Sequence, residues 1–319
     1  MVPRVGMTDL KVFAGASHAV LAREICRALG LSLGATHTTR FSNENLKVKI
    51  EENVREQDVF VVQTACPPLS EGIVELLIML DALKHSSARR VTAVLPYFPY
   101  ARSDKKDEPR ISITARLMAD LLATAGADRV LTLDLHSPQI QGFFTMPADH
   151  LSAVPLLCER MAAGGGLEEA VVVAADVGEV KDAGRFAKRL DLPLAFIDKR
   201  RSGDDENARA VAMVGDVHGK DCWLVDDEIA TGGTIFDATE FLLRSGARSV
   251  SAAVVHPVLS GSAVARLAVS PLERLVVTDT IPIPADKQSP KIEVLSVAPL
   301  IATAITRIHD GRSISELFV

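Results

Sequence analysis

The sequence has no long hydrophobic run, no cysteine cluster and no excess of positive charge. No stretch approaches the ~18 consecutive apolar residues of a membrane span, and residues 1–10 lack the apolar segment typical of a signal peptide. The four cysteines form no C-x-x-C pair and no zinc spacing, which favours buried thiols in a reducing compartment. Asp and Glu total 41 against 35 Lys and Arg, which disfavours a broad nucleic-acid surface. We therefore expect a cytoplasmic protein that binds neither membranes nor nucleic acid.

The composition and the order of the apolar segments predict an α/β protein. The chain has 319 residues, of which 48% are hydrophobic and 24% charged, as in ordinary globular proteins. Short apolar runs typical of buried parallel strands alternate with helical patterns, which indicates βαβ units. The expected strands are 10–14, 59–63, 91–95, 130–133, 171–175, 194–197, 222–225, 251–255 and 275–278. The expected helices are 18–29, 71–85, 111–125, 180–190, 235–245 and 299–309.

A run of glycines at 164–166 lies near the expected boundary between two domains. We place these domains at residues 1–155 and 156–319, because each half is long enough for one doubly wound sheet. We also expect the C-terminal helix to pack back on the first domain.

Residues 225–234, with the sequence VDDEIATGGT, join an expected strand to an expected helix. The strand ends in Asp226 and Asp227, at the sheet edge where open α/β proteins bind ligands, and these acids can hold sugar hydroxyls or a cation. The glycines allow backbone N–H groups to approach a phosphate at the helix N-terminus. The alternative is a capped turn in which the acids have no function. The loop resembles the phosphoribosyl-pyrophosphate loop of type I phosphoribosyltransferases, and it lacks the Walker A pattern.

Asp134 and His136 follow the expected strand at 130–133. On an extended strand end, residues at i and i+2 point to the same face, where this pair could meet a Mg–nucleotide. For such a pair alone, a histidine with a purely structural role is the more common outcome.

Segment 96–106, PYFPYARSDKK, leads from an expected strand into a basic loop. Arg102 could stack on a nucleotide or pair with its phosphate. Such charge runs are usually solvated surface loops, which is the alternative.

Segment 197–206, IDKRRSGDDE, places three cations at a strand end, before a polar loop that contains glycine and acids. This composition suits a loop that closes over an anionic transition state, because Lys and Arg stabilise charge on a transferring phosphoryl group. In isolation, a solvated surface loop is again the more common explanation.

These four segments together resemble those of the ribose-phosphate pyrophosphokinases, also called PRPP synthetases. The resemblance extends over nearly the whole chain, from KVFAGASH at 11–18 to SISELF at 313–318. It implies two tandem phosphoribosyltransferase-like domains, each with a mainly parallel sheet flanked by helices. It also implies transfer of the β,γ-diphosphoryl group of ATP to O1 of ribose 5-phosphate with Mg²⁺, which gives PRPP and AMP. The implied partners are ATP, ribose 5-phosphate and further copies of the chain, in a homo-oligomer built from dimers and often a hexamer.

The resemblance also implies roles for individual residues. The implied catalytic cations are Lys199 and Arg201. The implied nucleotide-binding residues are Phe41, Asn43, Asn45, Arg102, Ser103, Asp107 and His136. The implied ribose 5-phosphate residues are Asp226, Asp227, Ala230, Thr231, Gly232, Gly233 and Thr234. The implied metal ligands are His136, Asp176 and, as a further candidate, Asp134. A regulatory site for phosphate or ADP is implied at Arg55, Ser87, Ser313 and Ser315, where simple helix capping is the alternative for the two serines.

Several positions depart from the family's pattern. Asn45 stands where the family usually has an acid, and Ser103 where Gln is usual, so both changes bear on the choice of nucleotide. Thr145 and Ala230 each replace a usual Asp, and Glu179 replaces a bare glycine beside the site for polyanions. Two alternatives therefore stay open: a regulatory homologue with little activity, and a phosphoribosyltransferase that consumes PRPP. ATP-dependent formation of AMP separates the leading hypothesis from both.

Overall fold

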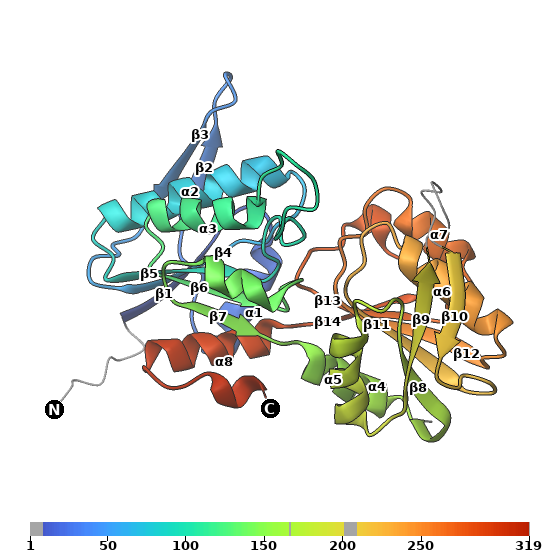
Figure 1. The fold of residues 1–319 in the computed structure, drawn as a ribbon. Helices are drawn as coiled ribbons and strands as arrows, with labels where there is room; N and C mark the ends of the chain where they lie inside the picture. Colours follow the sequence, from blue (N-terminus) through green and yellow to red (C-terminus); the bar gives the residue numbers. More distant parts are fainter. Residues whose placement is uncertain (1–8, 166, 201–208, 319) are drawn as a thin grey trace. The chain divides into compact units, whose positions relative to one another are not determined.

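The computed structural model describes residues 9–165, 167–200 and 209–318. The chain forms two compact α/β units, each with a mainly parallel sheet flanked by helices (Figure 1). The first unit comprises Met1–Ser152, Thr280–Pro282 and Ser296–Val319, and the second comprises Ala153–Asp279 and Ile283–Leu295. The last part of the chain therefore contributes two segments to the first unit, whereas the sequence analysis places a single division after residue 155.

The sheet of the first unit has the strand order β1-β4-β5-β6-β7, and each neighbouring pair is parallel. Its strands are β1 (Leu10–Ala14), β4 (Asp58–Val62), β5 (Arg90–Leu95), β6 (Arg129–Leu133) and β7 (Ala148–Leu151). All residues of β4 are buried, as expected of a parallel strand that is covered on both faces. Residues 59–62 of this strand are apolar at every position because helices cover both faces of the sheet, and this apolar run is what predicts the strand.

Helices cover both faces of this first sheet. They are α1 (Ala19–Leu29), α2 (Leu69–His85), α3 (Thr114–Thr124) and α8 (Ala298–His309). Helices α2 and α3 pack on one face, where they share a buried apolar cluster with β4 and β5. Helix α8 lies on the other face, and α1 packs against it (Figure 1). The C-terminal helix is therefore part of the first unit.

An antiparallel hairpin extends from the first unit (Figure 1). It consists of β2 (Thr36–Arg40) and β3 (Leu46–Ile50). The sequence analysis misses it, because THTTR and LKVKI lack the continuous apolar run of the buried strands. The hairpin carries the turn at residues 41–45, where three of the expected nucleotide-binding residues lie.

The sheet of the second unit has the strand order β10-β9-β8-β11-β12-β13-β14. The edge strand β10 is antiparallel to β9, and the other neighbouring pairs are parallel. Its strands are β8 (Ala170–Ala174), β9 (Leu194–Arg200), β10 (Arg209–Val214), β11 (Asp221–Glu228), β12 (Ser249–His256), β13 (Leu275–Thr278) and β14 (Ile292–Leu295). Its helices are α4 (Val154–Ala163), α5 (Val180–Leu190), α6 (Gly233–Arg244) and α7 (Ala263–Val269).

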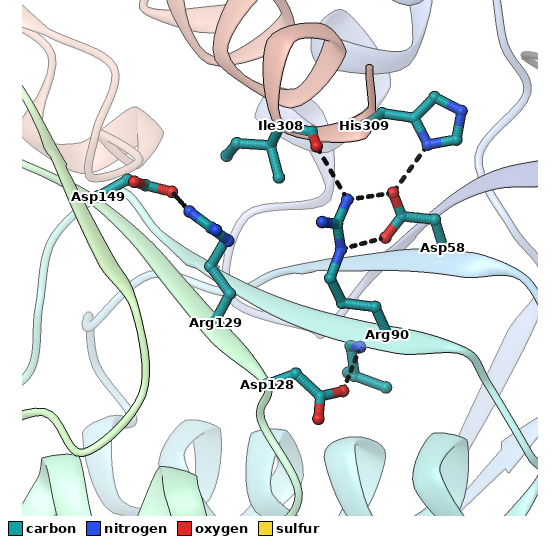
Figure 2. Close-up of polar contacts among 8 residues, drawn as sticks. Asp58, Arg90, Asp128, Arg129, Asp149, Ile308 and His309 are labelled. Atoms are coloured by element: carbon teal, nitrogen blue, oxygen red, sulfur yellow. Dashed lines mark hydrogen bonds and ion pairs between the residues drawn. The ribbon is translucent and has the colours of Figure 1, made fainter. Parts of the chain in front are cut away.

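A buried polar network fastens the end of α8 to the amino ends of β4 and β5 (Figure 2). Asp58 is fully buried, and Arg90 donates to both of its carboxylate oxygens, with Nε to Oδ1 at 2.8 Å. Arg90 also donates to the Ile308 carbonyl at 3.1 Å, and His309 Nδ1 lies 2.7 Å from Asp58 Oδ2. A single carboxylate thus joins two strands and the C-terminal helix.

Among the described residues, no helix is both long and apolar enough to cross a membrane.

Candidate active site

The carboxyl edge of the second sheet brings together residues from separate parts of the sequence. Strands β8 and β11 are neighbours with Ala174 opposite Val225, so the loop after β8 lies beside Asp226 and Asp227. On the other side of β8, Ala174 pairs with Phe196 of β9, and the backbone of Lys199 follows towards the same edge. The side chain of Lys199 and the whole of Arg201 lie outside the described residues.

Three carboxylates converge at this edge. Glu179, Asp226 and Asp227 each offer an oxygen within 4.8 Å of those of the others. Burial raises the pKa of Asp226 well above its ordinary value, and the negative charges of Asp227 and Glu179 raise it further. The backbone N–H of Asp227 donates to Asp226 Oδ1 at 2.8 Å and partly offsets this cost. Asp226 and Asp227 are identified from the sequence, and the resemblance places Glu179 beside the site for polyanions; the neighbouring strands β8 and β11 show that the three carboxylates meet.

The donor set of this cluster fits a hard divalent cation, because Mg²⁺ prefers carboxylate oxygens. In residues 9–165, 167–200 and 209–318, it is the one group of three or more His, Cys, Asp or Glu with this spacing. Asp176 is not a member of the cluster. Its Oδ1 accepts hydrogen bonds from the backbone N–H groups of Gly178 at 2.8 Å and Glu179 at 3.3 Å, so it shapes the loop that holds Glu179.

Glu179 is expected to cost stability at neutral pH. The folded state raises the pKa of Asp226, so the destabilising contribution of this carboxyl is absent below its ordinary pKa, grows as pH rises from that value to the raised one, and is constant above it. Glu179→Gln removes one of the like charges. We expect it to raise the free energy of unfolding by about 1 kcal/mol at pH 7.5 and to change little at pH 3.

Urea unfolding at the two pH values, with EDTA present, measures this difference. Glu240→Gln is the matched control, because Glu240 lies on the exposed surface of α6 and pairs with Arg244 at 3.5 Å. An equal change at both pH values in Glu179→Gln would show that packing, and not charge, accounts for the effect.

The loop at residues 231–234 leads directly into α6. Its backbone is anchored from both sides, because Ser260 N–H donates to the Ala230 carbonyl at 3.0 Å and Phe236 N–H to the Gly232 carbonyl at 2.9 Å. Gly232 has φ +75°, and a Cβ there would lie 2.2 Å from Cε2 of Phe236. Thr231 and Thr234 are exposed. Because the first N–H groups of a helix have no partner within it, this loop presents donors suited to a phosphate.

Asp134 and His136 lie in the first unit. Strand β6 ends at Leu133, and Asp134 has φ +28°, so the backbone is not extended there. The extended strand end on which the i, i+2 argument depends is therefore absent at Asp134, and a shared face for the two side chains stays a prediction. Asp134 is buried and accepts a hydrogen bond from Ser152 Oγ at 2.8 Å, which gives it at least a structural role.

Ser103 fastens the basic loop to the start of α3. Its hydroxyl donates to the Ser112 carbonyl at 3.3 Å and accepts from Thr114 N–H at 3.3 Å. Arg102 and Asp107 are exposed in the same loop. Arg102 is therefore exposed to solvent, while the two hydrogen bonds of Ser103 fix the loop to the start of α3.

The hairpin turn carries Phe41, Asn43 and Asn45. Phe41 is 49% exposed, which is unusual for a phenyl ring, and its N–H donates to the Asn45 carbonyl at 2.9 Å. Asn43 Oδ1 accepts from Asn45 N–H at 3.2 Å and so stabilises the turn. Between the hairpin and α2 lies a cavity of about 510 Å³, whose lining includes Asn45 and Val74.

Two side chains of β2 fix the hairpin on α2. Thr38 Oγ1 donates to Glu75 Oε1 at 2.8 Å, and Arg40 pairs with Glu71 at 3.0 Å. Residues two apart on a strand share a face, as do residues four apart on a helix, so one face of β2 contacts one face of α2.

Two of the expected regulatory residues, Arg55 and Ser87, lie near the amino edge of the first sheet. Glu56 N–H donates to the Ser87 carbonyl at 2.9 Å, which places Ser87 next to the segment that contains Arg55. Ser313 follows α8, whose end is fixed to the same edge by Asp58, and its Oγ accepts from Ser315 N–H at 3.1 Å. That contact closes a local turn at residues 313–315, and the regulatory role stays a prediction.

Comparisons with known proteins agree along nearly the whole chain. The family model for the N-terminal domain of ribose phosphate pyrophosphokinase matches residues 10–126, and that for the phosphoribosyl synthetase-associated domain matches 205–319. The ribose-phosphate pyrophosphokinase of Clostridium acetobutylicum is 49% identical over 311 residues, 97% of each chain. That of Rhizobium meliloti is 50% identical over 310 residues, 97% of this chain and 100% of the relative. The crystal structure of phosphoribosylpyrophosphate synthetase from Mycobacterium smegmatis matches with a TM-score of 0.90 and 45% identity, and covers 95% of this chain and 99% of that one.

Two mainly parallel α/β units, with carboxylates and a glycine-containing loop at a carboxyl edge, are typical of α/β enzymes that act on phosphorylated ligands. The chain belongs to the ribose-phosphate pyrophosphokinase family. This confirms the resemblance and the fold class that the sequence indicates. The roles of individual residues stay predictions.

Proposed function

We propose that this protein transfers the β,γ-diphosphoryl group of ATP to O1 of ribose 5-phosphate and forms PRPP and AMP. The carboxylate pair beside the Thr231–Thr234 loop is the observation that carries the proposal, since one edge offers acceptors for ribose hydroxyls and donors for a phosphate. The near full-length identity to relatives named ribose-phosphate pyrophosphokinase supports it.

In this proposal, the second unit binds the acceptor sugar. Asp226 and Asp227 hold the ribose hydroxyls, because carboxylate oxygens accept hydrogen bonds from them. The loop of Ala230, Thr231, Gly232, Gly233 and Thr234 holds the 5-phosphate with backbone N–H groups and two hydroxyls. Lys199 and Arg201 stabilise charge on the transferring group.

The nucleotide lies among Phe41, Asn43, Asn45, Arg102, Ser103, Asp107 and His136 in this proposal. His136, Asp176 and Asp134 serve the Mg–nucleotide, and the cluster of Glu179, Asp226 and Asp227 has the donors for a further Mg²⁺. Bound Mg²⁺ would neutralise negative charge on the diphosphoryl oxygens. Arg55, Ser87, Ser313 and Ser315 form the proposed phosphate or ADP regulatory site. The proposal includes a cytoplasmic homo-oligomer built from dimers, with a hexamer as one such assembly.

Formation of AMP and PRPP from ribose 5-phosphate and Mg–ATP tests the activity. The assay is run with and without inorganic phosphate and beside a panel of other nucleoside triphosphates, with ribose replacing ribose 5-phosphate as the control. We expect PRPP and AMP to form in equal amounts. The panel of nucleoside triphosphates shows how Asn45 and Ser103 affect the choice of nucleotide. Inactivity of the folded protein with every nucleotide would instead favour the regulatory homologue, for which the charge added by Glu179 is the supporting observation.

Gly232→Ala is expected to raise the KM for ribose 5-phosphate at least about tenfold. The new Cβ would collide with the Phe236 ring and would sit on a backbone with φ +75°, which L side chains rarely adopt. Steady-state kinetics with each substrate varied measures the effect. Gly184→Ala is the matched control, because a Cβ at Gly184 in α5 meets nothing within 4 Å.

A further inference from the structure

Helix α7 places an arginine beside the phosphate loop of the second unit. Arg266 Nη1 lies 3.5 Å from the position that a Cβ would take at Gly233, the first residue of α6. Figure 1 shows α6 and α7 in the second unit, and the two helices are in contact. The guanidinium is therefore next to the helix end that the proposed function assigns to the 5-phosphate.

The same guanidinium is held in place by α6. It lies over the Phe236 ring, 5.3 Å from the centroid, and donates to Asp237 Oδ1 at 3.1 Å. The Phe236 ring also packs against Gly232, the glycine with φ +75°. One ring thus supports both the loop and the cation, so the position of the charge is coupled to the shape of the loop.

We propose that Arg266 is a positioning residue that strengthens binding of the 5-phosphate, and that Asp237 limits this effect by pairing with it. The inference rests on the proposed function, because that function assigns the phosphate to the loop. A fixed positive charge near a phosphate attracts it, and the attraction falls with ionic strength because the arginine side chain is 40% exposed. The Phe236 ring stabilises the cation through a cation–π contact and keeps it at the loop.

The proposal predicts opposite effects for the two partners. Arg266→Gln should raise the KM for ribose 5-phosphate about 3- to 10-fold, with kcat and the KM for ATP within about twofold of the wild type. Asp237→Asn should lower the KM for ribose 5-phosphate about two- to threefold, because the cation is released and a repulsive charge is removed. Arg266→Lys should recover part of the loss, since it keeps the charge without the planar stacking.

The experiment combines kinetics with direct binding. The KM values are measured at low and at high KCl, and calorimetry compares ribose 5-phosphate with ribose as ligands of the unmodified protein and the variants. We expect the difference between wild type and Arg266→Gln to shrink at high salt and to vanish for ribose. Arg244→Gln is the control, because Arg244 lies at the far end of α6, where it pairs with Glu240.

Several outcomes would overturn the proposal. They are wild-type affinity of Arg266→Gln for ribose 5-phosphate, an equal loss of affinity for ribose, and a loss unaffected by salt. If Arg266→Gln does not fold, Asp237→Asn still decides the matter, since unchanged binding in that variant contradicts the role of the ion pair. A wild type that binds ribose 5-phosphate without making PRPP would refute the proposed function but leave this test intact.

Discussion

Lys199→Ala is expected to lower kcat for PRPP formation about 10²- to 10³-fold with little change in either KM. The backbone of β9 brings residue 199 to the carboxyl edge of the second sheet, where the carboxylates and the phosphate loop also lie. Negative charge on the transferring diphosphoryl oxygens needs a cation at that edge, and the carboxylates alone would oppose it. A loss confined to kcat indicates that the interaction forms in the transition state.

The measurement is steady-state kinetics with both substrates varied, after thermal unfolding shows that the variant is folded. Lys188→Ala is the matched control, because Lys188 is exposed in the last turn of α5 and thus at the far end of that helix from the site. Lys199→Arg tests whether charge alone suffices. Wild-type kcat in Lys199→Ala would exclude this lysine from the reaction.

The buried parallel strands could be predicted because coverage on both faces leaves an apolar run in the sequence. AVVVA in β8 and DVFVV in β4 are of this kind, and every residue of both is buried. The hairpin β2–β3 could not be found by that signal, because no residue of either strand is fully buried: β2 is the polar run THTTR, and in β3 exposed lysines alternate with half-buried apolar residues. Strand β10 is likewise an edge strand, and its antiparallel pairing with β9 is not predicted from the sequence.

Candidate site residues that are adjacent in the sequence can be grouped from it, whereas the sheet is needed to show which distant residues meet them. Asp226, Asp227 and the loop that follows are one segment, and the strand–helix junction fixes their order. Glu179 lies beside them because β8 and β11 are neighbours in a particular register. The order of strands in a sheet cannot be predicted from the local amino-acid composition. Arg266 reaches the same loop from α7, a helix that the sequence analysis does not predict.

Asp58→Ala is expected to lower the stability of the first unit by about 3–5 kcal/mol. The substitution leaves Arg90 without its carboxylate partner and removes the hydrogen-bond partner of the buried His309 ring (Figure 2). Loss of the buried carboxylate costs more than the ion pair contributes, because the half-buried Arg90 guanidinium and the buried His309 ring lose their shared acceptor. Since this network also anchors the end of α8, that helix should detach first.

Native-state amide hydrogen exchange measures the effect locally. Amides of β4, β5 and α8 should exchange faster in Asp58→Ala, whereas those of β11 in the second unit should be unchanged. Asp120→Ala is the matched control, because Asp120 forms an exposed pair with Arg116 at 3.0 Å, and such pairs contribute roughly 0–1 kcal/mol. Equal protection of α8 in Asp58→Ala and the wild type would mean that apolar packing alone holds the helix. The expected selective loss would instead show that one buried carboxylate fixes the C-terminal helix, and with it the segment that carries Ser313 and Ser315.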